Sequence, residues 1–182
     1  MTSRGASGAS ARRASVALAA VAALLFAAAA SARGVYQTPE AFVREVYAGD
    51  PPAPRLLWLT KELQAEAAHI LGHDYPAARL RYWLRDERSA WILEEIGKEK
   101  PITVGIVIDG GKIELVRVLI FRESRGDEVR HPFFTDQYKG AALRSDRELD
   151  RPIDGITGAT LSVRALTRLA RLALFLHDEA AR

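Results

Sequence analysis

The sequence predicts an α+β domain in which an antiparallel β-meander packs with helices and a C-terminal helix closes the chain. Three observations predict it: helical spacing of apolar residues before residue 72, strand-like runs with short joins between residues 79 and 121, and helical spacing again after residue 160. Short joins favour antiparallel neighbours, because parallel strands need long crossovers. The composition, with 48% hydrophobic and 27% charged residues, is that of a globular protein and excludes wholesale disorder.

The first 32 residues have the three parts of a signal peptide. Residues 1–13 are small, polar and basic, residues 14–30 form an apolar run, and Ala30-Ser31-Ala32 supplies the small residues that a signal peptidase accepts. The run is at the short end for a spanning helix, so a retained N-terminal anchor is the alternative. We therefore expect an extracytoplasmic protein, in the periplasm or at the outer face of the cytoplasmic membrane.

The remaining chain divides into residues 33–100, with helices and strands, and residues 101–182, which contain a polar loop and the last helix. Its charges balance, because the net charge of +3 equals the three arginines of residues 1–32, where no acidic residue occurs. A nucleic-acid partner is therefore not expected. The absence of cysteine excludes disulfides, iron–sulfur clusters and thiolate zinc sites.

The two helices before the sheet have clear ends. Thr38 is a candidate N-cap with Pro39 at the first helical position, where its missing N–H is not needed. A proline-rich stretch near residue 52 ends this helix. The second helix is predicted from about Thr60 to Leu71, where Gly72 ends it.

Four strands are predicted next, at residues 80–84, 90–96, 102–108 and 112–121. The last two are joined by Asp109-Gly110-Gly111, a strong hairpin signal. In the last strand the alternation slips near Leu115 and Val116, which indicates either a bulge or burial of both faces. An irregular polar loop over residues 124–152 and a helix over residues 161–176 complete the chain.

The stretch from Asp154 to Ser162, with the sequence DGITGATLS, carries the strongest functional signal. Its glycines allow a turn, and the hydroxyl residues of the stretch then lie at the start of the last helix. The free N–H groups and the positive dipole end at a helix start favour binding of a phosphate. Ordinary capping of the helix by Thr157 or Thr160 is the alternative interpretation.

This stretch resembles the flavinylation motif of the FMN-binding domain family, whose relatives include extracytoplasmic subunits of ion-pumping NADH:quinone reductases and of Rnf-type electron-transfer complexes. The resemblance implies that a flavin transferase joins FMN covalently, through a phosphoester, to the hydroxyl of Thr160. It also makes Asp154 the leading acid of the motif and residues 157–159 its small core. A weaker resemblance runs back to about Pro101, which identifies residues 101–182 as the FMN-binding domain.

Three aromatic residues of the polar loop, Phe133, Phe134 and Tyr138, either stack on the flavin or anchor the loop to the core. Gln137 and Lys139, from a Gln-Tyr-Lys-Gly stretch that also resembles the family, are candidates to bond the flavin edge or phosphate. The candidate FMN-binding residues are Phe133, Gln137, Lys139, Asp154, Gly155, Thr157, Gly158, Ala159, Thr160 and Ser162.

The resemblance thus implies an exported electron-transfer flavoprotein with a membrane or periplasmic redox partner, more an electron carrier than a complete enzyme. A flavin-dependent oxidoreductase acting on a small substrate and a module that binds FMN or another anion noncovalently are the alternatives.

Two further patterns of charged or metal-ligating residues occur in the chain. His69 and His73 have the spacing of a two-histidine metal face, but apart from Asp74 no third ligand is evident, so no metal site is expected. The arginine row at positions 164, 168 and 171 is either a solvated helix face or a dock for an acidic partner.

Overall fold

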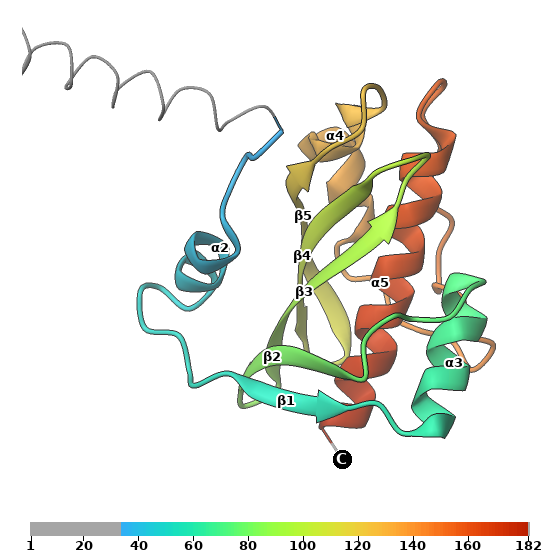
Figure 1. Cartoon of the computed structure of the whole chain (residues 1–182). Coiled ribbons are helices and arrows are strands. Elements are labelled where there is room, and N and C mark those ends of the chain that lie inside the picture. The colour runs from blue at the N-terminus through green and yellow to red at the C-terminus, as the bar shows by residue number, and fades with distance from the viewer. Residues whose placement is uncertain (1–33, 182) are drawn as a thin grey trace, which may run out of the picture. The chain divides into compact units, whose positions relative to one another are not determined.

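The computed structural model describes residues 34–181 (Figure 1), and the expected signal peptide over residues 1–32 lies outside them. The five strands form one antiparallel sheet in the order β1-β2-β3-β4-β5, so the predicted α+β meander is confirmed. The strands are β1 (Arg55–Trp58), β2 (Arg79–Arg85), β3 (Arg88–Ile96), β4 (Pro101–Asp109) and β5 (Lys112–Phe121). The helices are α2 (Pro39–Val46), α3 (Lys61–Leu71), α4 (Pro132–Thr135) and α5 (Thr160–Ala180), with short 3-10 turns η1 (Asp127–Arg130) and η2 (Asp136–Tyr138).

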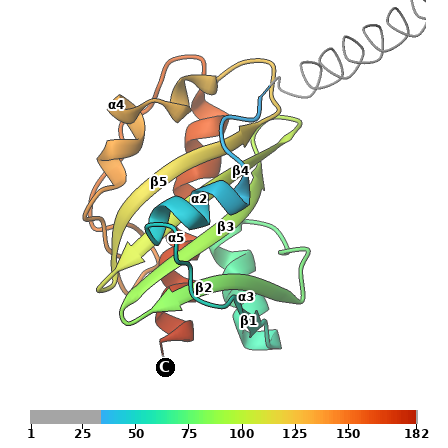
Figure 2. The ribbon, with the colours of Figure 1, turned by 90° about the vertical axis from the view of Figure 1, so that its left-hand side faces the viewer.

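Helices cover both faces of the sheet (Figures 1 and 2). Helices α5 and α3 pack on one face, where Tyr82 and Trp91 stack inside the larger apolar core. On the other face α2 forms a smaller core with strand residues such as Val107 and Leu119. Within residues 34–181, no helix combines the length and the apolar character that crossing a membrane requires.

The predicted start of α2 and end of α3 are confirmed, whereas α2 ends at Val46, before the proline-rich stretch that was expected to end it, in a turn where Ala48 and Gly49 have positive φ. Thr38 Oγ1 accepts a hydrogen bond from the Ala41 N–H at 3.2 Å, and Pro39 is the first residue of α2. Gly72 ends α3 with φ +78°, a conformation that glycine adopts without strain.

Glycine also allows α2 to approach the sheet. A Cβ atom placed on Gly105 would lie 2.5 Å from Cζ of Phe42, whose ring is fully buried. The ring therefore rests directly on the backbone of β4, and any larger residue at position 105 would push α2 away from the sheet.

The first strand, β1, was not predicted. Its register pairs Leu56 with Arg81 and Trp58 with Arg79 at one edge of the sheet. Only four residues long, it is too short to show an alternation in the sequence. The opposite edge, β5, is covered by the chain before α2, because the Tyr36 and Gln37 N–H groups donate to Leu119 O at 2.9 and 3.2 Å.

The predicted hairpin and the irregularity in β5 are both present. Gly110 and Gly111 form the turn with positive φ values of 54° and 72°. The pairing of β4 with β5 shifts register between Thr103 and Val104 and again between Val107 and Ile108. The shifts place Leu119 among the α2 core residues, so both faces of β5 are partly buried.

Helix α5 extends four residues beyond its predicted end at position 176, to Ala180. Its last turns stay packed because His177 is buried and its Nδ1 lies 2.8 Å from the Ser89 hydroxyl. The Trp91 indole N–H donates to the same hydroxyl at 2.8 Å. Burial lowers the pKa of His177, which favours the neutral ring in this apolar setting.

The arginine row of α5 is not a uniformly solvated face. The Arg171 side chain is 13% exposed, donates to Arg147 O at 2.5 Å and pairs with Glu148 at 2.8 Å. Arg168 lies 4.0 Å from the buried carboxylate of Glu95, and of the three arginines Arg164 alone is exposed. Two of the three arginines therefore fix the helix to the rest of the domain.

Candidate functional site

An open hollow with a volume of about 590 Å³ lies at the start of α5. Three chain segments meet there. They are the turn between β3 and β4 at Lys98, the chain just after β5 at residues 123–125, and the end of the predicted motif at residues 158–162. Residues 158–162 include four of the ten predicted site residues: Gly158, Ala159, Thr160 and Ser162.

The start of α5 carries no side-chain cap. Ala159 occupies the N-cap position with φ −114° and ψ 18°, and Thr160 is the first helical residue. The interpretation that Thr157 or Thr160 caps this helix is therefore wrong. The first N–H groups of α5 stay free of side-chain acceptors within the described chain, which leaves them to solvent or to a ligand.

Ser162, in the first turn of α5, has an unused hydroxyl. The residue is 4% exposed and lines the hollow, and its hydroxyl makes no hydrogen bond within residues 34–181. Every fully buried side-chain polar atom of residues 34–181 has a hydrogen-bond partner, so this hydroxyl is open to the hollow, where water or a ligand can bond to it. Gly126 makes room for it, because a Cβ at position 126 would lie 2.8 Å from Ser162 Oγ.

Glu123 holds the turn that borders the hollow. Its Oε1 accepts the backbone N–H groups of residues 98, 99 and 100 at 2.5, 2.6 and 2.8 Å. Burial acts to raise the pKa of Glu123, but the three donors outweigh it and hold the pKa below its ordinary value. The carboxylate is thus ionised at neutral pH and fixes the backbone that carries Lys98.

Two cationic side chains face the same hollow. Lys98 pairs with the exposed Glu99 at 3.4 Å, which is a weak surface contact. Arg125 makes no ion pair within the described residues. Together with the positive end of α5, these side chains make the hollow suited to a phosphate group.

The start of the motif lies outside the lining of the hollow but is tied to the polar loop. The Asp154 N–H donates to Gln137 Oε1 at 2.7 Å, so Gln137 positions the motif backbone. Lys139 pairs with Asp136 at 3.0 Å. Gly155 and Thr157 are exposed, with open space beside Gly155.

The three aromatic residues of the loop divide into two groups. Phe134 and Tyr138 are fully buried and meet edge to face at 5.7 Å, and the Tyr138 hydroxyl lies 2.9 Å from Thr167 Oγ1. These two rings anchor the loop to the core. Phe133 is 65% exposed, stacks on His131 with ring centroids 6.2 Å apart, and does not line the hollow.

The residues that complete the hollow are not among those predicted from the sequence: Lys98, Glu123, Ser124 and Arg125. The predicted hairpin could have placed two of the three segments side by side, because the two open ends of an antiparallel hairpin lie next to each other. The pairing of Ile102 with Phe121 puts the chain before β4 beside the chain after β5. Nothing local in the sequence, however, places this end of the sheet against the start of α5.

Of the two histidines with the spacing of a metal face, His69 belongs to α3, whereas His73 lies beyond the end of α3 at Leu71. His73 Nε2 lies 2.9 Å from Glu95 Oε1, while His69 is exposed. Within residues 34–181 no group of three or more potential ligands could hold a metal ion. The Asp74 carbonyl and Glu95 raise the pKa of His73, which favours a charged pair with Glu95.

Comparison with known protein families matches residues 97–174 to the FMN-binding domain. The match spans every residue that lines the hollow, from Lys98 to Ser162. Neither the comparison with curated proteins nor that with solved structures gives a match.

Proposed function

The chain contains an FMN-binding domain over residues 97–174, and from this premise we propose that it is an exported electron-transfer flavoprotein with FMN attached covalently to Thr160. One observation carries the proposal. Thr160 is an exposed hydroxyl residue at the uncapped start of α5, on the wall of a cationic hollow of about 590 Å³.

The residues present fit the phosphate end of such a group. The free N–H groups of the first turn of α5 point toward the helix N-terminus and can donate to phosphate oxygens. Lys98 and Arg125 add positive charge, and the Ser162 hydroxyl, on the wall of the hollow, offers one more donor. Glu123 supports this arrangement indirectly, since it fixes the turn that carries Lys98.

Attachment would be made by a flavin transferase, the first partner that the proposal requires. The new bond forms between Thr160 Oγ1, which loses its proton, and the flavin-side phosphorus of a flavin dinucleotide, whose pyrophosphate bond breaks so that the nucleoside monophosphate leaves. Access to the hydroxyl is open, because Gly158 and Thr160 are exposed and Leu161 is 41% exposed. A transferase can therefore reach Thr160 without unfolding α5.

A covalent bond has a physical advantage outside the cytoplasm. A dissociable cofactor occupies its site only while free cofactor is present near its Kd, and an exported protein loses that supply by dilution. A phosphoester removes this dependence, so the site can hold the ring loosely in an open hollow. FMN supplies the redox chemistry, while the chain orients the group and keeps it accessible to a redox partner.

Export and the nature of the partner belong to the same proposal. The apolar run and small-residue site of residues 1–32 support an extracytoplasmic location, with a membrane or periplasmic redox partner. The open hollow favours a carrier over an oxidoreductase with its own small substrate, because it leaves a bound flavin accessible to a redox partner.

The attachment is tested by producing the full chain together with a flavin transferase and measuring flavin fluorescence of the denatured band in a gel. Thr160→Val should abolish the fluorescence, because valine has the same shape without the hydroxyl. Thr160→Ser is the matched control and should retain it. Fluorescence that persists in Thr160→Val would refute attachment at this residue, and wild-type flavin released by acid precipitation would indicate noncovalent binding instead.

A further inference from the structure

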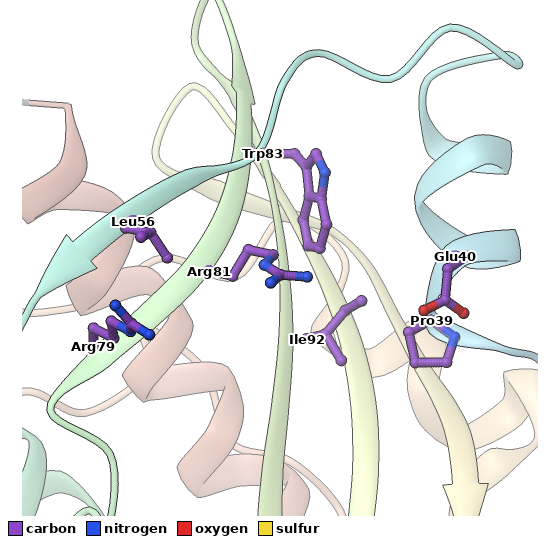
Figure 3. A pocket seen from close by; sticks show the side chains of 7 residues that line it. All are labelled: Pro39, Glu40, Leu56, Arg79, Arg81, Trp83 and Ile92. Carbon is purple, nitrogen blue, oxygen red and sulfur yellow. The ribbon is translucent and has the colours of Figure 1, made fainter.

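A second hollow, of about 470 Å³, lies between the start of α2 and the outer face of strands β1, β2 and β3 (Figure 3). We propose that it binds a small amphipathic anion, a flat apolar body that carries one carboxylate, phosphate or sulfonate group. Its volume falls within the range of small-molecule sites. The proposal does not depend on the flavin, because this hollow and the one at Thr160 share no lining residue.

The sheet register brings two guanidinium groups to the centre of this surface. Arg79, Arg81 and Trp83 alternate along β2, so their side chains share one face. Leu56 of β1 pairs with Arg81, and Ile92 of β3 lines the other side. Figure 3 shows Arg81 between Leu56 and Ile92, with Trp83 further along the same strand.

The two arginines lack a partner anion. Within residues 34–181, neither Arg79 nor Arg81 makes an ion pair or a side-chain hydrogen bond, whereas Arg85 and Arg88, at the end of β2 and the start of β3, pair with Asp50 and Glu114. Like charges on one face repel, so an anion placed between the two arginines would be stabilised by both.

One of the arginines is already oriented. The guanidinium carbon of Arg79 lies 5.3 Å from the ring centroid of Trp58, a cation–π contact that restrains the side chain. Because the Arg79 side chain is restrained before binding, it loses less conformational entropy when a ligand binds. The single acidic residue of the lining, Glu40, lies in the first turn of α2, where the helix dipole favours its charge.

The apolar part of the ligand has a defined place. Trp83 and Ile92 are partly buried against the core beneath α2, and their remaining surface faces the hollow. Leu56 is 49% exposed on the opposite wall. A flat ring system can lie on the indole and the isoleucine while its anionic group meets the arginines.

This site lies far from the start of α5. In Figure 1, β1 and β2 are at the lower end of the domain, and α5 begins at the upper end. The proposed ligand would therefore bind equally to the flavin-loaded and the flavin-free chain.

The test titrates naphthoate into the full-length, flavin-loaded protein by isothermal calorimetry, with neutral naphthamide as the matched ligand. We expect saturable binding of naphthoate, and binding about tenfold weaker for naphthamide and for Arg81→Gln, the size of one lost charge-assisted hydrogen bond. Arg44→Gln, an exposed arginine of α2 outside the lining, is the control and should bind as the wild type does.

Methyl NMR of the wild type locates the ligand without any variant, and the Ile92 signal should shift on titration. Equal affinity for both ligands, an unchanged affinity in Arg81→Gln, or shifts confined to residues 158–163 would each overturn the proposal. Binding to anionic vesicles without any naphthoate binding would overturn it too, and would assign this face to a membrane surface. Arg79→Gln, which removes the other guanidinium of the lining, serves if Arg81→Gln does not fold, and it should weaken naphthoate binding to a similar extent.

Discussion

Replacing Gly126 by alanine tests whether the start of α5 is shaped for a ligand. Gly126 has φ +87°, a conformation that disfavours residues with a Cβ atom. An added Cβ would lie 2.8 Å from Ser162 Oγ and 3.4 Å from Ala159 Cβ, both of which belong to the wall of the hollow. The substitution therefore strains the backbone and presses on the first turn of α5.

The expected loss of stability is the sum of two effects. An alanine in the left-handed region costs about 1 kcal/mol. Contact with Ser162 adds roughly 1 kcal/mol, at the low end for overpacking because a serine hydroxyl can rotate. A total of about 2 kcal/mol lowers the Tm of a domain of this size by roughly 4–8 °C.

The assay is thermal and urea unfolding of four flavin-free proteins: wild type, Gly126→Ala, Ser162→Ala and the double variant. Removing the Ser162 hydroxyl removes the close contact, so Gly126→Ala should destabilise the Ser162→Ala protein by only about 1 kcal/mol. Flavin loading should fall in Gly126→Ala as well. An unchanged Tm, or the same loss with and without the Ser162 hydroxyl, would refute the reasoning.

Three further predictions concern carboxylates and a histidine. Glu123→Gln should slow flavin loading several-fold, because the charged acceptor of three backbone N–H groups is lost. Glu99→Gln, in the same turn, is the control and should load as fast as the wild type. Equal loading time courses for the two variants would contradict this prediction. Because the pKa of His73 is raised in the folded protein, its pairing with Glu95 stabilises the fold fully at a pH below 6.5, the ordinary pKa of histidine. This stabilisation is lost as the pH rises through the folded-state pKa of His73. The Tm difference between wild type and His73→Gln should therefore be larger at about pH 5.5 than at about pH 8.5. A difference that grows with pH would show the opposite sign of linkage. Asp154→Ala should leave the Tm unchanged, since the side chain is exposed, yet block loading if the transferase recognises this acid; normal loading would remove Asp154 from the site.

Features set by neighbouring residues were predictable from the sequence. Thr38 caps α2, Gly72 ends α3, and the two glycines of the β4–β5 hairpin adopt positive φ, because each depends on local backbone chemistry. The antiparallel order of the sheet followed from short joins in the same way. The match of residues 97–174 to the FMN-binding domain agrees with the motif read at residues 154–162.

Features set by distant residues were not predictable. Strand β1 exists because β2 offers it an edge, and its four residues carry no periodic signal. The last turns of α5 depend on the contact between His177 and Ser89, which are 88 positions apart. Similarly, Glu123 borders the hollow only because the sheet brings residues 97–100 beside it.

The candidate site was thus predicted at one of its three segments. The motif gave Thr160 and its helix start, but two details required the structure: Ala159 takes the N-cap position without a side-chain cap, and the Ser162 hydroxyl lacks a partner within the described residues. Both depend on how residues 158–162 meet the chain after β5.

Mass spectrometry of the chain produced together with a flavin transferase tests the central claim most directly. Attachment of FMN to Thr160 predicts an intact mass higher than that of the polypeptide by one FMN less one water, with the adduct on the peptide that contains Thr160. An intact mass equal to that of the bare polypeptide, or an adduct on a peptide without Thr160, would contradict it.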